Sequence, residues 1–323
     1  MSSGGPVEED RLRIGISRCL LGEEVRHDGG HKRDRFLTDG LGRYVEWVPV
    51  CPEVEAGMSI PRPAIRLVDA PGGPEVREVK SGADHTRRMR DHARQRVRAL
   101  AKLDLCGYVL KKDSPSCGME RVKLWKESGP PSRNGRGVFA QELMERLPLL
   151  PVEEEGRLND ARLRDGFVER IFAYQRLRRL FESRWSARQL VEFHTAHKLQ
   201  LMAHAPPAVR ELGQIVAGVR SIPRAEVQSR YETGFMQALC KQATTRRQVN
   251  VLQHMIGYLR KDLDPARRQE LAELIEDYRR ELIPLIVPVT LIRHHVRHLG
   301  IDYLEGQTYL EPHPKELMLR NHV

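Results

Sequence analysis

The sequence predicts an α/β domain with a mainly parallel, Rossmann-like sheet, followed by a mostly α-helical domain. Three observations support this prediction. In the first half, short runs rich in β-branched and aromatic residues alternate with a helix-like segment. In the second half, long stretches carry apolar residues at helical spacing and strand signals are few. Between the halves, EEEGRLND (153–160) is a polar, acidic stretch typical of a domain boundary.

The first-half elements can be placed in order. Three short runs have the composition of buried strands: RIGIS (13–17), YVEWVPV (44–50) and GYVLK (107–111). Between the second and the third, residues 83–103 repeat apolar side chains at helical spacing and predict a helix. The order strand, helix, strand indicates parallel pairing. The tract SGPPSRNGRG (128–137) is rich in Pro and Gly and predicts a loop.

The second half predicts a series of amphipathic helices, with Ser186 and Asp264 as N-caps. The helix-like stretches are 165–182, 186–204, 228–244, 246–263 and 264–283. We therefore predict a disordered tail over 1–10, a first domain over 11–160 and a second over 161–323.

Length and composition limit the class of protein. A chain of 323 residues with 40% hydrophobic content can bury two cores. No apolar run has the length of a bilayer span, and the polar, acidic start MSSGGPVEED lacks the layout of a signal peptide. We therefore expect a cytoplasmic protein with no membrane partner. Five cysteines, an odd number, do not suggest a disulfide framework.

The net charge of +10 is concentrated in the second half, where residues 161–323 contain 26 Lys and Arg against 18 Asp and Glu. This asymmetry favours a polyanionic partner, and a solvated helical surface is the alternative interpretation. The best candidates for a phosphate-contacting face form one arginine series: Arg170, Arg176, Arg178, Arg179, Arg184 and Arg188.

Three of the five cysteines follow predicted strands. Cys19, Cys51 and Cys117 each come at or shortly after the carboxyl end of a strand, the edge where ligand-binding loops of an open α/β sheet gather. Three converging thiolates suit zinc, copper(I) or an iron–sulfur cluster, although buried cysteine is also a common apolar residue. We assign Cys106 and Cys240 to that second class.

Longer strings carry a family resemblance. In the first half these are SRCLLGEEVRHDGGHK (17–32), VCPEVEAGMSIPRPAIRL (50–67) and LKKDSPSCG (110–118), which resemble the thiouracil desulfidase (TudS-like) family. In the second half, FHTAHKLQLMAH (193–204) and YLEGQTYLEPHPKELMLRN (303–321) resemble the YbgA-type domain. Together they resemble the long, fused form of the family, the RudS-type tRNA 4-thiouridine desulfidases.

The resemblance implies a specific chemistry. Cys19, Cys51 and Cys117 would hold a [4Fe–4S] cluster whose fourth iron has no protein ligand, with Glu55 as catalytic acid/base and Ser114 as active-site serine. Hydrolysis of the thiolated uracil would transfer its sulfur to the open iron. The reaction would convert 4-thiouridine to uridine without net redox change. Thiolated tRNA would be the partner, and the basic second domain would bind it.

Two other functions remain open from the residues. One is a desulfidase acting on free thiouracil, with the second domain serving another role. The other is a nucleic-acid-binding protein whose metal site is purely structural.

Overall fold

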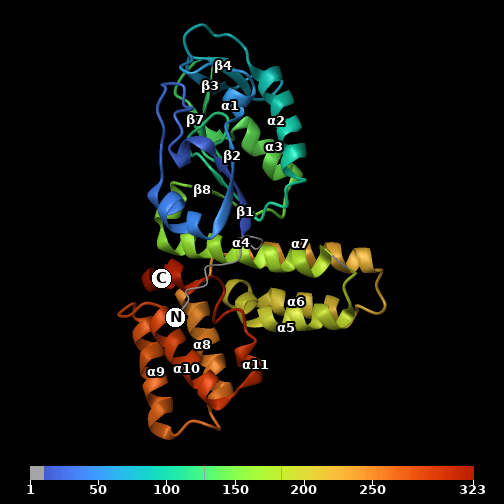
Figure 1. The fold of residues 1–323 in the computed structure, drawn as a ribbon, viewed down its shortest axis with the longest axis vertical. Helices are drawn as coiled ribbons and strands as arrows, with labels where there is room; N and C mark the ends of the chain where they lie inside the picture. Colours follow the sequence, from blue (N-terminus) through green and yellow to red (C-terminus); the bar gives the residue numbers. More distant parts are fainter. Residues whose placement is uncertain (1–10, 127, 183) are drawn as a thin grey trace, which may run out of the picture. The chain divides into compact units, whose positions relative to one another are not determined.

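The computed structural model describes residues 11–126, 128–182 and 184–323, and the tail predicted to be disordered, 1–10, lies outside these ranges. The chain divides after Asn159 into two compact units, one residue before the predicted boundary. The first unit is α/β and contains the described strands, whereas the second is built from helices (Figure 1). The predicted fold class is therefore confirmed.

Sheet A of the first unit is fully parallel. Its order is β2-β1-β5-β8, and the register pairs Ile16 of β1 with Pro49 of β2 and Val109 of β5. Four consecutive residues of β1, from Ile14 to Ser17, are buried, as expected for a strand covered on both faces. The three predicted strands are confirmed and β8 was not foreseen. The bounds are Leu12–Ser17 for β1, Val45–Val50 for β2, Gly107–Leu110 for β5 and Val152–Glu154 for β8.

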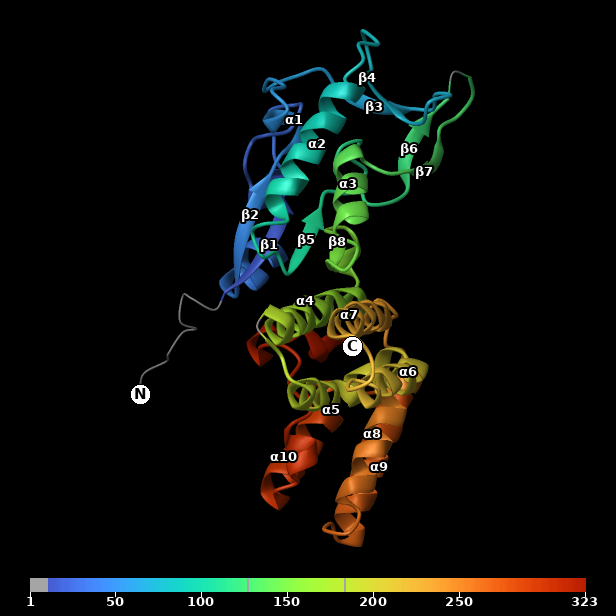
Figure 2. The ribbon, with the colours of Figure 1, turned by 90° about the vertical axis from the view of Figure 1, so that its right-hand side faces the viewer.

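Helices α2 (Thr86–Leu100) and α3 (Val138–Arg146) lie side by side on one face of sheet A (Figure 2). The predicted helix over 83–103 is α2, and its apolar stripe faces inward because Met89, Ala93 and Val97 are buried. A third, one-turn helix, α1 (Pro52–Glu55), begins directly after β2 with a proline at its first position.

A second, smaller sheet was not predicted. Sheet B has the order β4-β3-β6-β7, with antiparallel outer pairs and a parallel central pair. The loop predicted over 128–137 is wrong in part, because β7 occupies four of its residues and pairs with β6 despite the Pro and Gly content. The bounds are Ile65–Val68 for β3, Glu75–Glu78 for β4, Val122–Trp125 for β6 and Ser132–Gly135 for β7.

The second unit is a helical array. Ser186 and Asp264 are N-caps as predicted, since each side chain accepts a hydrogen bond from the backbone N–H three residues later. No helix in the described residues combines the length and apolar character needed to cross a bilayer. The helices are α4 (Ala161–Glu182), α5 (Ala187–His204), α6 (Pro206–Ala217), α7 (Arg224–Leu239), α8 (Thr245–Leu259), α9 (Pro265–Arg279), α10 (Ile286–Leu299) and α11 (Asp302–Glu305). Three of these helices, α6, α10 and α11, were not predicted from the sequence.

The core of the second unit holds charged groups as well as apolar ones. Apolar side chains of α5, α8, α9 and α10 form one buried cluster. Beside it, the buried Glu169 carboxylate accepts a hydrogen bond from Gln200 at 2.8 Å and lies 3.4 Å from His204 Nε2. Arg320, also buried, donates to the Tyr309 carbonyl at 2.6 Å. Pairing of this kind is what allows charges to remain in a low-dielectric interior.

The arginine series predicted to contact phosphate is only partly exposed. Arg170 and Arg176 are half-buried, and the Arg176 guanidinium donates to the Pro312 carbonyl at 2.6 Å. Arg188 is exposed but forms an ion pair with Glu192 at 2.7 Å. The series therefore does not form one continuous exposed face along α4.

Candidate active site

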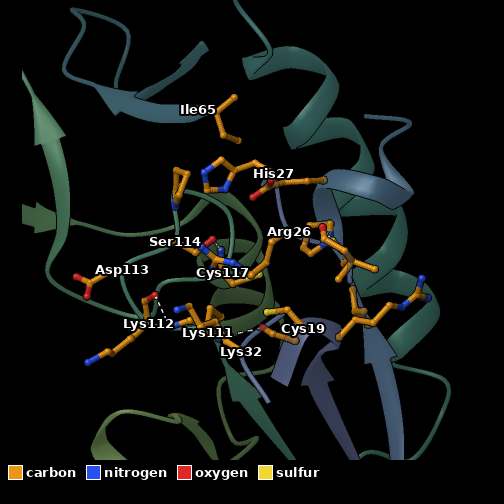
Figure 3. A pocket seen from close by; sticks show the side chains of 18 of the residues that line it. Cys19, Arg26, His27, Lys32, Ile65, Lys111, Lys112, Asp113, Ser114 and Cys117 are labelled. Atoms are coloured by element: carbon orange, nitrogen blue, oxygen red, sulfur yellow. Dashed lines mark hydrogen bonds between the residues drawn. The ribbon is translucent and has the colours of Figure 1, made fainter. Parts of the chain in front are cut away.

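The carboxyl edge of sheet A gathers the three cysteines predicted as cluster ligands. Cys19 lies in a short 3₁₀ helix, Arg18–Leu21, that directly follows β1. Cys51 is the N-cap residue of α1 and directly follows β2. Cys117 lies in the loop after β5. Because parallel strands end at the same edge, the three thiols line one pocket of about 380 Å³ (Figure 3).

The thiols are buried and influence one another electrostatically. Burial raises the pKa of Cys19 to about 11, with the nearby Cys51 adding to the effect. Burial likewise raises the pKa of Cys51, and it raises that of Cys117 well above its ordinary value. Without a metal the thiols therefore hold their protons at neutral pH. Metal binding would have to displace those protons.

The loop carrying Cys117 is held by Ser114. The Ser114 hydroxyl oxygen accepts hydrogen bonds from the backbone N–H groups of Ser116 at 3.2 Å and Cys117 at 3.1 Å. Gly137 allows this loop to approach α3, because a Cβ at that position would lie 2.5 Å from the Ser116 carbonyl carbon and oxygen. Ser114 lines the pocket, and in both of its side-chain hydrogen bonds within the described residues its oxygen is the acceptor. That hydrogen is therefore available to a ligand.

The two glutamates of α1 point in different directions. Glu53 lines the pocket, whereas Glu55, predicted as the catalytic acid/base, does not. The Glu55 carboxylate instead accepts the Cys51 N–H at 3.1 Å and pairs with Arg96 of α2 at 2.9 Å. Helical residues two apart are rotated by about 200° around the axis, so only one of the pair can face the pocket. Of the two glutamates of α1, Glu53 is thus the one that lines the pocket.

Glu53 is fixed from two sides. Its Oε1 accepts a hydrogen bond from the Ser116 hydroxyl at 2.7 Å, and its Oε2 accepts one from the buried Arg62 guanidinium at 2.8 Å. Arg62 also donates to the Val25 carbonyl at 3.1 Å. Sequence reasoning missed Glu53 and Arg62. The available signal was the helical phase of the CPEVE segment, which places its glutamates on opposite sides.

The pocket lining carries more positive than negative side chains. Lys111 forms an ion pair with Glu155, and Arg26 lies 3.3 Å from Asp28. Lys32 and Lys112 are exposed (Figure 3). This excess favours an anionic cofactor or ligand. The lysines and arginines of the lining are Arg18, Arg26, Lys32, Arg62, Lys111 and Lys112.

The three thiols of the pocket form a soft donor set. Within the described residues, no group of three His, Cys, Asp or Glu side chains is spaced to hold one metal ion. Three soft thiol ligands in a cationic, largely buried pocket match the preferences of an iron–sulfur cluster.

Two family models and two curated proteins match parts of this chain. Residues 14–155 match the family model described as 2-thiouracil desulfurase, and residues 198–314 match a model described as a protein of unknown function, DUF1722. The uncharacterized protein YbgA of Escherichia coli (strain K12) is 34% identical over 165 residues, covering 51% of this chain and 98% of YbgA. The uncharacterized protein YbbK of Bacillus subtilis (strain 168) is 30% identical over 153 residues, covering 45% and 97%.

A solved structure is also similar to part of this chain. It is titled as the [4Fe–4S]-dependent thiouracil desulfidase TudS and is 29% identical, with a TM-score of 0.39, covering 46% of this chain and 94% of its own. The class of protein is thus a two-domain chain with a thiol-lined α/β site. The chain is a relative of YbgA and YbbK, and its first unit matches the 2-thiouracil desulfurase family over residues 14–155.

Proposed function

We propose that this protein is a [4Fe–4S]-dependent desulfidase that replaces the sulfur of a thiolated uracil by oxygen, with 4-thiouridine in tRNA as its substrate. The observation that carries the proposal is the convergence of Cys19, Cys51 and Cys117 on one pocket. The match of residues 14–155 to the 2-thiouracil desulfurase family supports the reaction class.

Cys19, Cys51 and Cys117 would hold the cluster. When bound, a cluster with three protein ligands supplies an open iron, a Lewis acid that attracts the soft thiocarbonyl sulfur of the base. The overall reaction consumes one water and releases hydrogen sulfide, so the protein must handle protons but no electrons.

Glu53 is the carboxylate placed to handle those protons. It is held by Ser116 and Arg62 in the wall that also contains Cys51, so little reorganisation is needed at the moment of reaction. It would accept a proton from the attacking water and pass one to the departing sulfur.

Ser114 would orient the base. Its oxygen accepts hydrogen bonds from two backbone N–H groups of the same loop, which hold the side chain in place. The hydroxyl hydrogen can then be donated to a ligand. A pyrimidine ring carbonyl is a suitable acceptor for that hydrogen.

The nucleic-acid part of the proposal rests on charge. Lys32 and Lys112 line the pocket and are exposed, which suits phosphates that flank a base entering from a polynucleotide. The base would have to leave its stack to reach the site. The net charge of +10 favours binding of a polyanion.

A free thiouracil is the second candidate substrate. The family model that matches residues 14–155 carries the description 2-thiouracil desulfurase, and the pocket volume of about 380 Å³ is ample for one base.

One experiment distinguishes the two substrates. Protein reconstituted anaerobically with iron and sulfide is incubated with 4-thiouridine-containing tRNA or with free 2-thiouracil and 4-thiouracil, and the products are measured by mass spectrometry. Conversion of 4-thiouridine to uridine in tRNA supports the proposal. Conversion of the free bases alone supports the second candidate, and no conversion by iron-loaded protein contradicts both.

A further inference from the structure

Sheet B has one apolar face and one basic face. Successive side chains of a strand point to opposite faces, and Leu67, Val76 and Leu124, which pair in register, are at most 7% exposed and form the buried face. The residues between them point the other way and define what we call the outer face of sheet B. It carries Arg66 and Val68 of β3, Glu75 and Arg77 of β4, and Lys123 and Trp125 of β6.

The arginines of the outer face are arranged unfavourably for folding alone. Arg66 and Arg77 lie directly opposite each other in the antiparallel pair of β3 and β4, and like charges in that position destabilise a sheet. Glu75 compensates Arg77, with 2.7 Å between Oε2 and Nη2. The Arg66 guanidinium lies over the Trp125 ring, 5.2 Å from its centroid, and its buried Nε has no hydrogen-bond partner among the described residues. The outer face therefore has room for an anion near Arg66.

Two further cations lie beside this pair. Lys123 is exposed on β6, two residues before Trp125. On β7, the exposed Arg133 lies opposite the same stretch of β6, between two residues that pair with it. The outer face thus combines an aromatic ring, a stacked guanidinium and exposed positive charges.

Sheet B borders the thiol-lined pocket. Ile65, directly before Arg66 on β3, lines that pocket (Figure 3). Arg133 Nη1 lies 3.9 Å from Oδ1 of Asp113, which lines the pocket as well. Both side chains of this ion pair are more than half exposed, at 58% and 61%, so water screens it and Arg133 stays available to another anion. A chain that delivers a base into the pocket can therefore continue along the sheet.

Single-stranded RNA is bound by groups of this kind. Its bases stack on aromatic rings and on arginine planes, while lysines and arginines neutralise its phosphates. We propose that the outer face of sheet B binds the RNA strand that flanks the thiolated base, with a base stacked on the Arg66–Trp125 pair and phosphates bound by Lys123 and Arg133. The inference rests on the proposed function, since this strand would belong to the tRNA substrate.

The double variant Lys123→Gln, Arg133→Gln tests the phosphate contacts at two exposed side chains, where substitution should leave folding intact. Iron-loaded protein is titrated with fluorescently labelled tRNA that lacks 4-thiouridine, so that binding is measured without turnover. The Kd should rise about tenfold, and the slope of log affinity against log salt concentration should fall by about one to two. The control is Arg98→Gln, Lys102→Gln, which removes the same two charges from exposed positions around the end of α2 and should bind like wild type.

Trp125→Leu tests the stacking contact. The loss of the ring should raise the Kd for the same tRNA about tenfold, whereas Trp125→Phe keeps an aromatic ring and should restore most of the affinity. Urea unfolding of both variants shows whether the first unit remains folded under the conditions of the titration.

The outcomes separate this inference from the proposed function. If the outer-face variants bind tRNA as tightly as a wild type that converts 4-thiouridine in tRNA, the inference fails alone. Equal losses in the double variant and its control would assign the effect to net charge and would also reject it. If loaded wild type converts no thiolated substrate, the proposed function fails, and a binding loss confined to the outer-face variants would still support an RNA-binding face. A wild type that binds no tRNA rejects the inference together with the tRNA substrate.

Discussion

The Ser116 hydroxyl donates a hydrogen bond to the Glu53 carboxylate, with 2.7 Å between Oγ and Oε1. This bond joins the loop after β5 to the helix after β2, and each partner lies within two residues of a predicted cluster ligand, Cys117 or Cys51. The two loops therefore form one wall of the pocket, in which a change at one residue is expected to affect its partner.

Glu53→Gln should lower the turnover of thiolated substrate by about 10²- to 10⁴-fold, because the amide cannot transfer protons. The iron content should stay at the wild-type value, as Glu53 is not a thiol ligand. Glu55→Gln is the matched control on the same helix and should keep turnover within about tenfold of wild type. If Glu55→Gln loses activity and Glu53→Gln keeps it, the carboxylate assignment is reversed.

Replacing any one of Cys19, Cys51 or Cys117 by Ala should abolish cluster retention, since three thiolates are the proposed ligands. Iron and sulfide per chain, together with visible absorption after anaerobic reconstitution, measure this loss. Cys106→Ala provides the control, because Cys106 is also a buried cysteine of the first unit but does not line the pocket. Equal iron in all four variants would exclude the proposed ligand set.

Gly137→Ala should destabilise the first unit by about 1–3 kcal/mol, the usual range for overpacking, because its Cβ would overlap the Ser116 backbone. Urea unfolding followed by circular dichroism gives the change in free energy of unfolding. At Gly166, inside α4, a Cβ meets nothing within 4 Å. Gly166→Ala should therefore stabilise the second unit by about 0.5–1 kcal/mol. A neutral Gly137→Ala would contradict the close approach of α3 to the cysteine loop.

The buried pair Glu169 and His204 should make the stability of the second unit depend on pH. Burial alone would raise the pKa of Glu169, but the interaction with His204 outweighs burial and lowers this pKa to about 2. Its contribution is thus present above about pH 4.5 and is lost as pH falls toward 2. The pKa of His204 is raised by Glu169 against the effect of burial, so its contribution is present below about pH 6.5 and is lost as pH rises through the raised value.

Thermal unfolding between pH 3 and 9 measures this dependence. Wild type should be most stable between the two limits, and Glu169→Gln should lower and flatten the profile. Glu192→Gln, at an exposed carboxylate paired with Arg188, should leave the profile unchanged. Parallel profiles for wild type and Glu169→Gln would contradict the ion pair.

Lys32→Ala and Lys112→Ala should each weaken tRNA binding. If each lysine contacts one phosphate, each substitution should also reduce the slope of log affinity against log salt concentration by about one. Turnover of a free thiolated base should change little, because it has no phosphate. Lys102→Ala, at an exposed lysine outside the pocket lining, is the control. Affinity for tRNA that is independent of these lysines would place the nucleic-acid contacts elsewhere.

Local patterns predicted much of the first unit. The β-branched runs became β1, β2 and β5, and the apolar stripe of residues 83–103 became the buried face of α2. Sheet B was missed because its strands are four residues long and half-exposed, which leaves too few positions for a period to emerge. The capping residues Ser186 and Asp264 were predictable because a cap acts only on the next turn of the helix.

The sequence by itself determined where the three cysteines would gather, because thiols placed after parallel strands share one edge of the sheet whatever the details of packing. Only the tertiary structure decided that Glu53 rather than Glu55 lines the same pocket. This outcome depends on Arg62, Ser116 and Arg96, which come from distant segments. Whether a polar atom finds a partner is set by what folds against it, and periodicity along the chain carries no such information.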